Sequence, residues 1–213
     1  MENAYLHKDG EAVEVRVGNE TKLRVPLLNL DGIVLFGYDC TVSAALLGAC
    51  AEADVTVSFH TPSGKFLAAS RGFTNGNIAL RRAQYRAADS HEAATAISRN
   101  IVLAKLANSR ALLQRAAREH GDGDAAAQAR LRDAAELLGH RIRAVQQVST
   151  IDEIRGFEGE GAVAYFAAFN DMITVPDRSL RLNGRTRQPP LDPVNSLLSF
   201  AYNLLMHDCR SAC

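Results

Sequence analysis

The spacing of apolar residues changes near residue 75, and this change limits the chain to a fold in two parts. Before it, apolar and polar residues alternate with a period of two, as in half-buried strands. Gly18-Asn19-Glu20 and Asp9-Gly10 read as tight turns between such strands, and 71–77 reads as a boundary turn. The predicted strands are 12–17, 21–27, 32–36, 55–59 and 65–70, with one short helix over 41–53.

After the boundary the period becomes about 3.6, which is typical of amphipathic helices. Thr150 followed by Glu153 forms a capping-box pattern, and Asp192-Pro193 supplies an N-cap and a first-turn proline. The predicted helices are 78–88, 90–119, 125–148, one opening at Thr150, and a final one from Pro193 onward, after an extended loop over 175–193. We therefore predict an α+β fold: a small β-domain over 1–74, then an all-helical domain over 75–213.

The 213 residues have no net charge, but the two parts differ in their balance. Residues 1–75 hold 6 Lys and Arg against 9 Asp and Glu, whereas 76–213 hold 18 against 15. In the second part 17 of the 18 cations are arginine, whose planar fork suits phosphate. The second part is therefore the better candidate for binding a polyanion, with a solvated helix surface as the alternative.

No apolar run approaches the roughly 20 residues of a membrane span, and the N-terminus lacks a signal-peptide layout. The four cysteines have neither zinc-type nor secreted-framework spacing, so we expect reduced thiols in a cytoplasmic protein. The final helix has no stop signal before Cys213, which predicts a fragment of a longer protein.

Three glycines crowd two glutamates in the stretch 154–161, "IRGFEGEG", at the start of a predicted helix. Glycine costs about 1 kcal/mol relative to alanine inside a helix, so this density needs a reason. Glu158 and Glu160 are two residues apart and face different directions on a helix, so at most one can hold a given ion. The alternatives are two acids that favour the helix dipole, or one carboxylate on a face cleared for a ligand.

Other candidate residues carry weaker signals. His207 and Asp208 are adjacent on the last helix and diverge by about 100°, so they are poor partners for one ion. Basic residues interleaved with an aromatic suit phosphate binding and stacking, as at Tyr85. The arginines in question are Arg81, Arg82 and Arg86 around Tyr85, and Arg185 and Arg187 on the extended loop.

Three separated blocks resemble the CRISPR-associated adaptation endonuclease, the integrase of spacer acquisition, in a form most similar to type I-C. The blocks are "RGFTNGNIALRRAQYR", "IRGFEGEGAVAYF" and "NGRTRQPPLDPVNSLLSFAYNLL", and they agree in order and spacing. The resemblance implies an N-terminal β-domain that forms a homodimer and a helical catalytic domain, which would be incomplete here. It also implies a small companion adaptation protein as partner.

The resemblance further implies a Mg²⁺ or Mn²⁺ site built from a glutamate, a histidine and an aspartate. The glutamate falls on Glu158, whereas the other two ligands of the family lie downstream of the "LLSFAYNLL" helix, so His207 and Asp208 are not assigned to that role. Arg81, Arg82, Arg86, Arg185 and Arg187 would bind double-stranded DNA. Tyr202 either faces the same site or is a core tyrosine.

The function expected for the family is metal-dependent DNA cleavage and strand transfer that inserts spacers into the CRISPR array. The 213 residues alone are expected to be inactive, since one carboxylate holds a divalent cation poorly. The alternative is a non-catalytic dimeric protein that binds DNA or acts as a scaffold.

Overall fold

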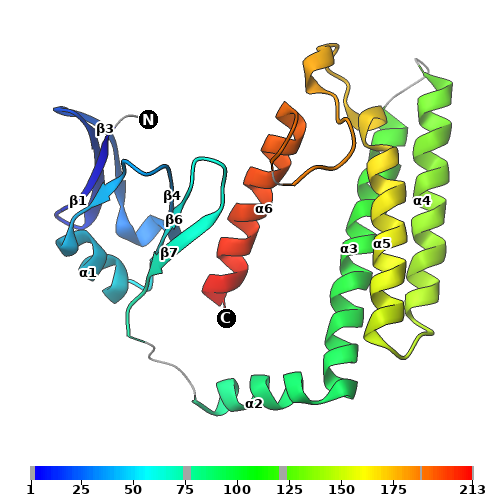
Figure 1. Ribbon diagram of the computed structural model, residues 1–213, viewed down its shortest axis with the longest axis horizontal. Coiled ribbons are helices and arrows are strands. Elements are labelled where there is room, and N and C mark those ends of the chain that lie inside the picture. The colour runs from blue at the N-terminus through cyan, green and yellow to red at the C-terminus, as the bar shows by residue number, and fades with distance from the viewer. Residues whose placement is uncertain (1–2, 74–77, 120–123, 188, 213) are drawn as a thin grey trace. The chain divides into compact units, whose positions relative to one another are not determined.

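The computed structural model describes residues 3–73, 78–119, 124–187 and 189–212 (Figure 1). The chain divides into two compact units. The first consists of residues 1–76, 187–190 and 196–213, and the second of residues 77–186 and 191–195. A strand-rich N-terminal region is followed by a helical region, so the predicted α+β fold class is confirmed.

The first unit contains two sheets, and α1 (Ala44–Glu52) packs with them. The four-stranded sheet has the order β3-β2-β1-β5, in which β1 pairs antiparallel with β2 and parallel with β5. The three-stranded sheet has the order β4-β6-β7, in which β4 and β6 are parallel. The strands are β1 (Ala4–Asp9), β2 (Ala12–Val17), β3 (Glu20–Pro26), β4 (Gly32–Phe36), β5 (Thr41–Val42), β6 (Thr56–His60) and β7 (Phe66–Ser70).

The core of this unit is apolar and lies between the sheets and α1. Ser43 caps α1 by accepting a hydrogen bond from the Leu46 amide, and Leu46 itself is fully buried. Cys40, Cys50 and Cys209 are free thiols, and burial raises the pKa of Cys50. The buried core residues are Ala4, Leu6, Val13, Leu27, Leu35, Leu46, Cys50, Val55 and Val57.

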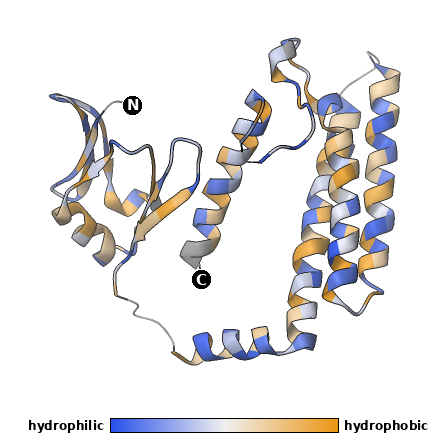
Figure 2. Cartoon of the chain, viewed as in Figure 1, coloured by the Kyte–Doolittle hydropathy of each residue, from blue (hydrophilic) through white to orange (hydrophobic). Residues whose placement is uncertain are grey.

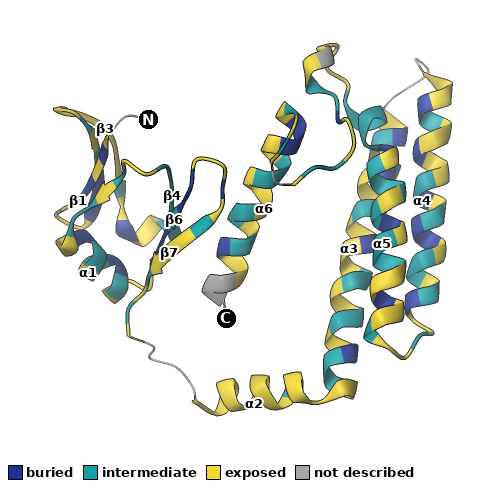
Figure 3. Cartoon of the chain, in the orientation of Figure 1, coloured by how far each residue is buried: buried dark blue, intermediate teal, exposed yellow. Residues whose placement is uncertain are grey.

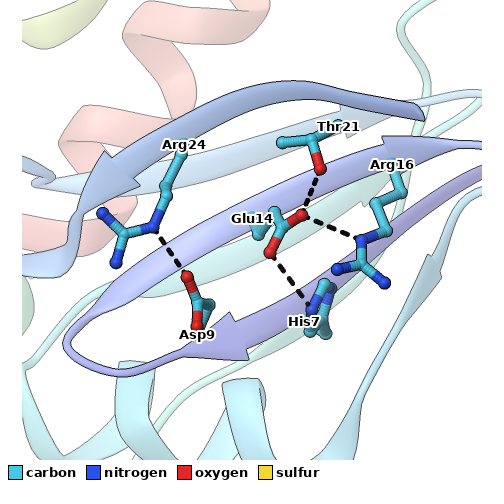
Figure 4. Close-up of polar contacts among 6 residues, drawn as sticks. All are labelled: His7, Asp9, Glu14, Arg16, Thr21 and Arg24. Carbon is cyan, nitrogen blue, oxygen red and sulfur yellow. Dashed lines mark hydrogen bonds and ion pairs between the residues drawn. The ribbon is translucent and has the colours of Figure 1, made fainter.

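The other face of the four-stranded sheet carries a polar cluster centred on Glu14, which is 6% exposed (Figure 4). Its carboxylate accepts hydrogen bonds from Arg16 Nε at 2.8 Å and from the Thr21 hydroxyl. His7 lies directly opposite on β1, with its Nε2 3.4 Å from the second carboxylate oxygen. The hydrogen bond from Arg16, followed by that from Thr21, lowers the pKa of Glu14 below its ordinary value of 4.5.

Replacing Glu14 by glutamine is expected to lower the thermal unfolding temperature at pH 7. Because the folded-state pKa lies below the unfolded value, the stabilisation is present above about pH 4.5 and is lost as the pH falls further. Melting curves of both proteins between pH 7 and pH 3 should therefore converge at the acidic end. A difference that is independent of pH would show that the charge of Glu14 contributes nothing.

The second unit is a helical bundle built on α3 (His91–Glu119), α4 (Ala125–Val145) and α5 (Ile151–Ala167). Figure 2 shows how apolar and polar residues share these helices, and Figure 3 shows the buried positions along them. Short 3-10 turns follow at Phe169–Met172 and Arg178–Leu180. The buried core residues are Leu106, Leu113, Ala117, Leu131, Ala135, Leu138, Val145, Ile154 and Ala168.

Two helical surfaces of this unit stay exposed. Ile97, Ile101 and Leu112, apolar positions of the predicted 90–119 helix, are 51%, 63% and 52% exposed. The opposite side of α3, with Leu106 and Leu113, enters the core. The helix α2 (Ile78–Asp89) contacts α3, but among the described residues it has no buried side chain.

The last helix, α6 (Pro193–Ala212), groups from Ser196 onward with the first unit. The Phe200 ring packs against Phe36 of β4 with centroids 5.1 Å apart, and the ring of His207 lies over Gly32. The compact units therefore differ from the predicted domains, because the predicted helical domain included all of 75–213. The side of α6 that carries Phe200, Asn203 and His207 contacts the three-stranded sheet and the loop after β6, a contact that periodicity within the helix does not specify.

Candidate functional site

The helix α5 starts where the capping box predicts. The Thr150 hydroxyl accepts a hydrogen bond from the Glu153 amide, and the Glu153 carboxylate accepts one from the Thr150 amide at 3.1 Å. Hydrogen bonding, mainly from the Thr150 side chain, lowers the pKa of Glu153. This reciprocal cap satisfies two amides of the first turn and offsets part of the glycine cost further along.

The three glycines of α5 do not share one role. A Cβ at Gly161 would collide with the Leu106 side chain, so this glycine allows α3 and α5 to approach closely. A Cβ at Gly156 or Gly159 would meet nothing within 4 Å. Packing within this unit therefore does not require these two glycines, and they leave one side of α5 bare.

The two glutamates beside them point to different helices. The Glu158 carboxylate contacts the Lys105 ammonium on α3, and its side chain is 30% exposed. The Glu160 carboxylate lies 2.7 Å from Arg141 Nε on α4, and the Arg141 guanidinium also stacks over the Phe157 ring at 5.7 Å. The two carboxylates therefore do not face one common site.

A divalent cation needs several oxygen or nitrogen ligands, and Glu158 offers one carboxylate. Across residues 3–73, 78–119, 124–187 and 189–212, no three His, Cys, Asp or Glu side chains lie close enough to hold a metal. His207 is buried, which lowers its pKa, whereas Asp208 is exposed. The described residues thus do not complete a metal site around Glu158.

Most arginines of the bundle are engaged in internal contacts. Arg130 forms a two-pronged ion pair with Asp171 at 2.9 and 2.7 Å, and Arg99 donates to the Val148 carbonyl at 2.7 Å. Arg110, Arg115, Arg141, Arg143, Arg155 and Arg181 also contact acids, a histidine or backbone carbonyls. These side chains already have partners within the protein, so the arginine count overstates the charge available to a ligand.

The arginines of α2 differ from these. The side chains of Arg81, Arg82 and Arg86 are exposed and have no hydrogen bond or ion pair within the described part of the chain. Tyr85, 76% exposed, lies on the same side of the helix, since residues three and four apart are neighbours. This side of α2, with Arg81, Arg82, Tyr85 and Arg86, is named the α2 basic face.

The remaining candidates lie apart in the fold. Arg185 donates from Nη1 to the Asn195 side chain at 2.9 Å, whereas Arg187 is exposed. Tyr202 is 48% exposed on α6, so it is not a core tyrosine. Arg185 and Tyr202 belong to different compact units.

Sequence reasoning missed two groups. The first is Lys105, the partner of Glu158. Its being the single lysine of residues 76–213 is visible in the sequence, but the sequence does not show that it pairs with Glu158. The second group is a hydrogen-bonded cluster around Asn195, whose members are spread over residues 183–195. Its partners become visible only once the loop is folded.

Taken together, these features define an α+β protein in which a strand-rich region precedes a helical bundle with an exposed basic helix. The family described as "CRISPR associated protein Cas1" matches residues 1–213, and the chain belongs to this family. Within the described residues, no helix has the length and apolar character needed to cross a membrane.

Curated relatives agree with this assignment. The chain is 44% identical over 214 residues to "CRISPR-associated endonuclease Cas1 1" of Chlorobaculum tepidum, covering 99% of this chain and 61% of the relative. It is also 44% identical to "CRISPR-associated endonuclease Cas1 2" of Rhodospirillum rubrum, covering 100% and 61%. The chain therefore spans about three fifths of the length of these relatives.

Solved structures show the same fold at lower identity. A CAS1 protein from Thermotoga maritima matches with a TM-score of 0.72 at 18% identity, covering 99% of this chain and 62% of that protein. A casposase bound to integration product matches with a TM-score of 0.73 at 22% identity, covering 99% and 58%. A chain of a Cas6-RT-Cas1–Cas2 complex matches with a TM-score of 0.74 at 22% identity, covering 99% and 22%.

Proposed function

We propose that this chain acts in the DNA cleavage and strand transfer that insert new spacers into a CRISPR array. The observation that carries the proposal is its 44% identity, over nearly its whole length, to two proteins named as CRISPR-associated endonucleases. Double-stranded DNA is the proposed substrate. The small companion is the second proposed partner, supported by similarity to a chain of a Cas1–Cas2 complex.

Glu158 is the residue we propose for the reaction centre. Its carboxylate is partly exposed, so a substrate can approach it. We also propose Mg²⁺ or Mn²⁺ as the cofactor of the whole protein, with Glu158 as one ligand. Because the described residues do not complete the ligand set, no chemical step is assigned to the ion.

The α2 basic face is the proposed contact for the DNA backbone. Replacing Arg81, Arg82 and Arg86 together by alanine should lower the slope of log affinity against log salt by up to about 3, since each phosphate contact contributes about 0.9. Fluorescence anisotropy with duplexes of unrelated sequence measures the affinity at salt concentrations between about 50 and 300 mM, and the slope follows from these values. Arg115, Arg130 and Arg155, which pair with acids, provide the matched triple control. Equal slopes for both triple variants would remove α2 from the interface.

A homodimer through the first unit is the proposed assembly. The strand β3 lies at the edge of the four-stranded sheet, and Leu23 on it is 55% exposed. An exposed edge presents unpaired backbone groups that a second chain can pair with. Sedimentation velocity of the chain should show a dimer, and Leu23→Lys should shift it toward monomer because a charge on an edge strand opposes pairing. Weak complexes dissociate at about tens of micromolar. A wild-type chain that is monomeric at this concentration would contradict the proposal.

A further inference from the structure

Asn195 lies in the first turn of α6 and is fully buried. Its side-chain oxygen accepts hydrogen bonds from the Thr186 amide and from Arg185 Nη1, both at 2.9 Å. Its side-chain nitrogen donates to the Gly184 carbonyl at 2.8 Å and to the Asp192 carboxylate at 2.7 Å. An asparagine amide has two donor hydrogens and two acceptor lone pairs, so all four are used.

Asp192 extends this cluster to the start of the helix. Its carboxylate accepts a hydrogen bond from the backbone N–H of Asn195 at 2.7 Å, as an N-cap does, and one from the backbone N–H of Asn183 at 3.3 Å. These hydrogen bonds, led by that from the Asn195 amide, lower the pKa of Asp192 and keep it ionised. The Thr186 hydroxyl accepts from the Leu191 amide at 3.1 Å, which closes the loop.

The cluster fixes a segment that has no regular secondary structure. Gly184 has φ = +76°, a left-handed conformation that glycine adopts without strain. Four consecutive residues, 183–186, each bond to Asp192 or Asn195 through a backbone or side-chain group. Without these hydrogen bonds the loop would sample many conformations, and ligand binding would cost the conformational entropy of restricting it to one.

We propose that Asn195 is a positioning residue for DNA binding. By fixing residues 183–186, it restricts the backbone that leads directly into Arg187, the next residue along the chain, and so lowers the conformational cost when Arg187 binds a DNA phosphate. Arg187 is exposed and makes no hydrogen bond or ion pair within the described residues, whereas Arg185 is tied into the loop. The inference rests on the proposed function, since it requires DNA as the ligand.

A double-mutant cycle on the 213-residue chain tests this. Asn195→Ala and Arg187→Ala should each weaken duplex DNA binding about tenfold, as for one charge-assisted hydrogen bond. The double variant should bind no more than about twofold weaker than either single variant, because without Asn195 the arginine is no longer pre-positioned. Asn195→Ala combined with the triple variant of α2 should instead show multiplied effects, since the two surfaces act independently.

Hydrogen exchange supplies the readout of position. The backbone amide of Thr186, which donates to Asn195, should exchange faster in Asn195→Ala, while the amides of the α4 core keep their protection, which shows that the bundle is folded. If the alanine variant does not fold, Asn195→Ser replaces it, because a single hydroxyl cannot bond to Gly184, Thr186, Arg185 and Asp192 together and adds no charge beside the Asp192 carboxylate.

The outcomes separate the two proposals. Faster exchange of the Thr186 amide with unchanged DNA affinity would overturn the positioning role and leave the proposed function intact. Multiplied effects of Asn195→Ala and Arg187→Ala would overturn it as well. A wild-type chain that does not bind DNA at all would overturn the proposed function, and the positioning role with it.

Discussion

Replacing Glu158 by glutamine is expected to reduce DNA strand transfer by about a hundred- to a thousandfold, the usual cost of removing one electrostatic group from a reaction centre. The assay requires a protein with the full length of its Cas1 relatives, since this chain spans 61% of them. Glutamine keeps the shape of the side chain and removes only its charge. Duplex DNA affinity should stay within about twofold, because that affinity depends on arginine contacts to phosphate.

Two neighbouring variants make this result specific. Glu160→Gln removes the same charge two residues away, where the carboxylate contacts Arg141 of α4, and should retain most of the activity. Lys105→Met breaks the ion pair while leaving the Glu158 carboxylate in place, and should also retain activity. Neither change should greatly alter stability, since exposed ion pairs contribute about 0–1 kcal/mol. Full activity in Glu158→Gln would remove Glu158 from the reaction centre, whereas a full-length wild-type protein without strand transfer would favour the scaffold alternative.

Leu113→Ala is expected to destabilise the helical bundle by about 2–5 kcal/mol. The Leu113 side chain is fully buried in the core of the second unit, and its removal costs transfer free energy and leaves a cavity. Urea unfolding followed by far-ultraviolet circular dichroism should show a lower midpoint with a similar slope.

The adjacent residue is the natural control for this prediction. Leu112 is 52% exposed, so Leu112→Ala should change the free energy of unfolding by about 0.5 kcal/mol or less. The two substitutions delete the same atoms from the same helix. They differ only in that the Leu113 side chain points into the core and the Leu112 side chain points toward solvent. Similar losses in both would mean that α3 packs in another register.

The comparison of Leu112 with Leu113 also shows what the sequence could and could not predict. Local signals were reliable: the capping box at Thr150 and the N-cap at Asp192 are both formed. These features depend on neighbouring residues in the chain. Which side of α3 enters the core depends on how α4 and α5 approach it, and periodicity alone did not select Leu113 over Ile97 and Ile101.

The candidate site divides in the same way. The sequence singled out Glu158 and the α2 arginines, and predicted that Glu158 and Glu160 face apart, as their different partners confirm. It did not distinguish Gly161, which fits against Leu106, from Gly156 and Gly159, which meet nothing. That difference arises from the distance between two helices. The role of Glu158 as a metal ligand stays a prediction.

The grouping of α6 with the first unit has a consequence for the synthesis of the protein. The first unit combines residues 1–76 with residues 187–190 and 196–213, whereas the helical unit is nearly continuous. A ribosome releases the N-terminal residues first, and domains generally fold as units as they emerge. The strands β4, β6 and β7 thus leave the ribosome well before Phe200 and His207 are translated. Until then their α6-facing side is open to chaperones and to other nascent chains.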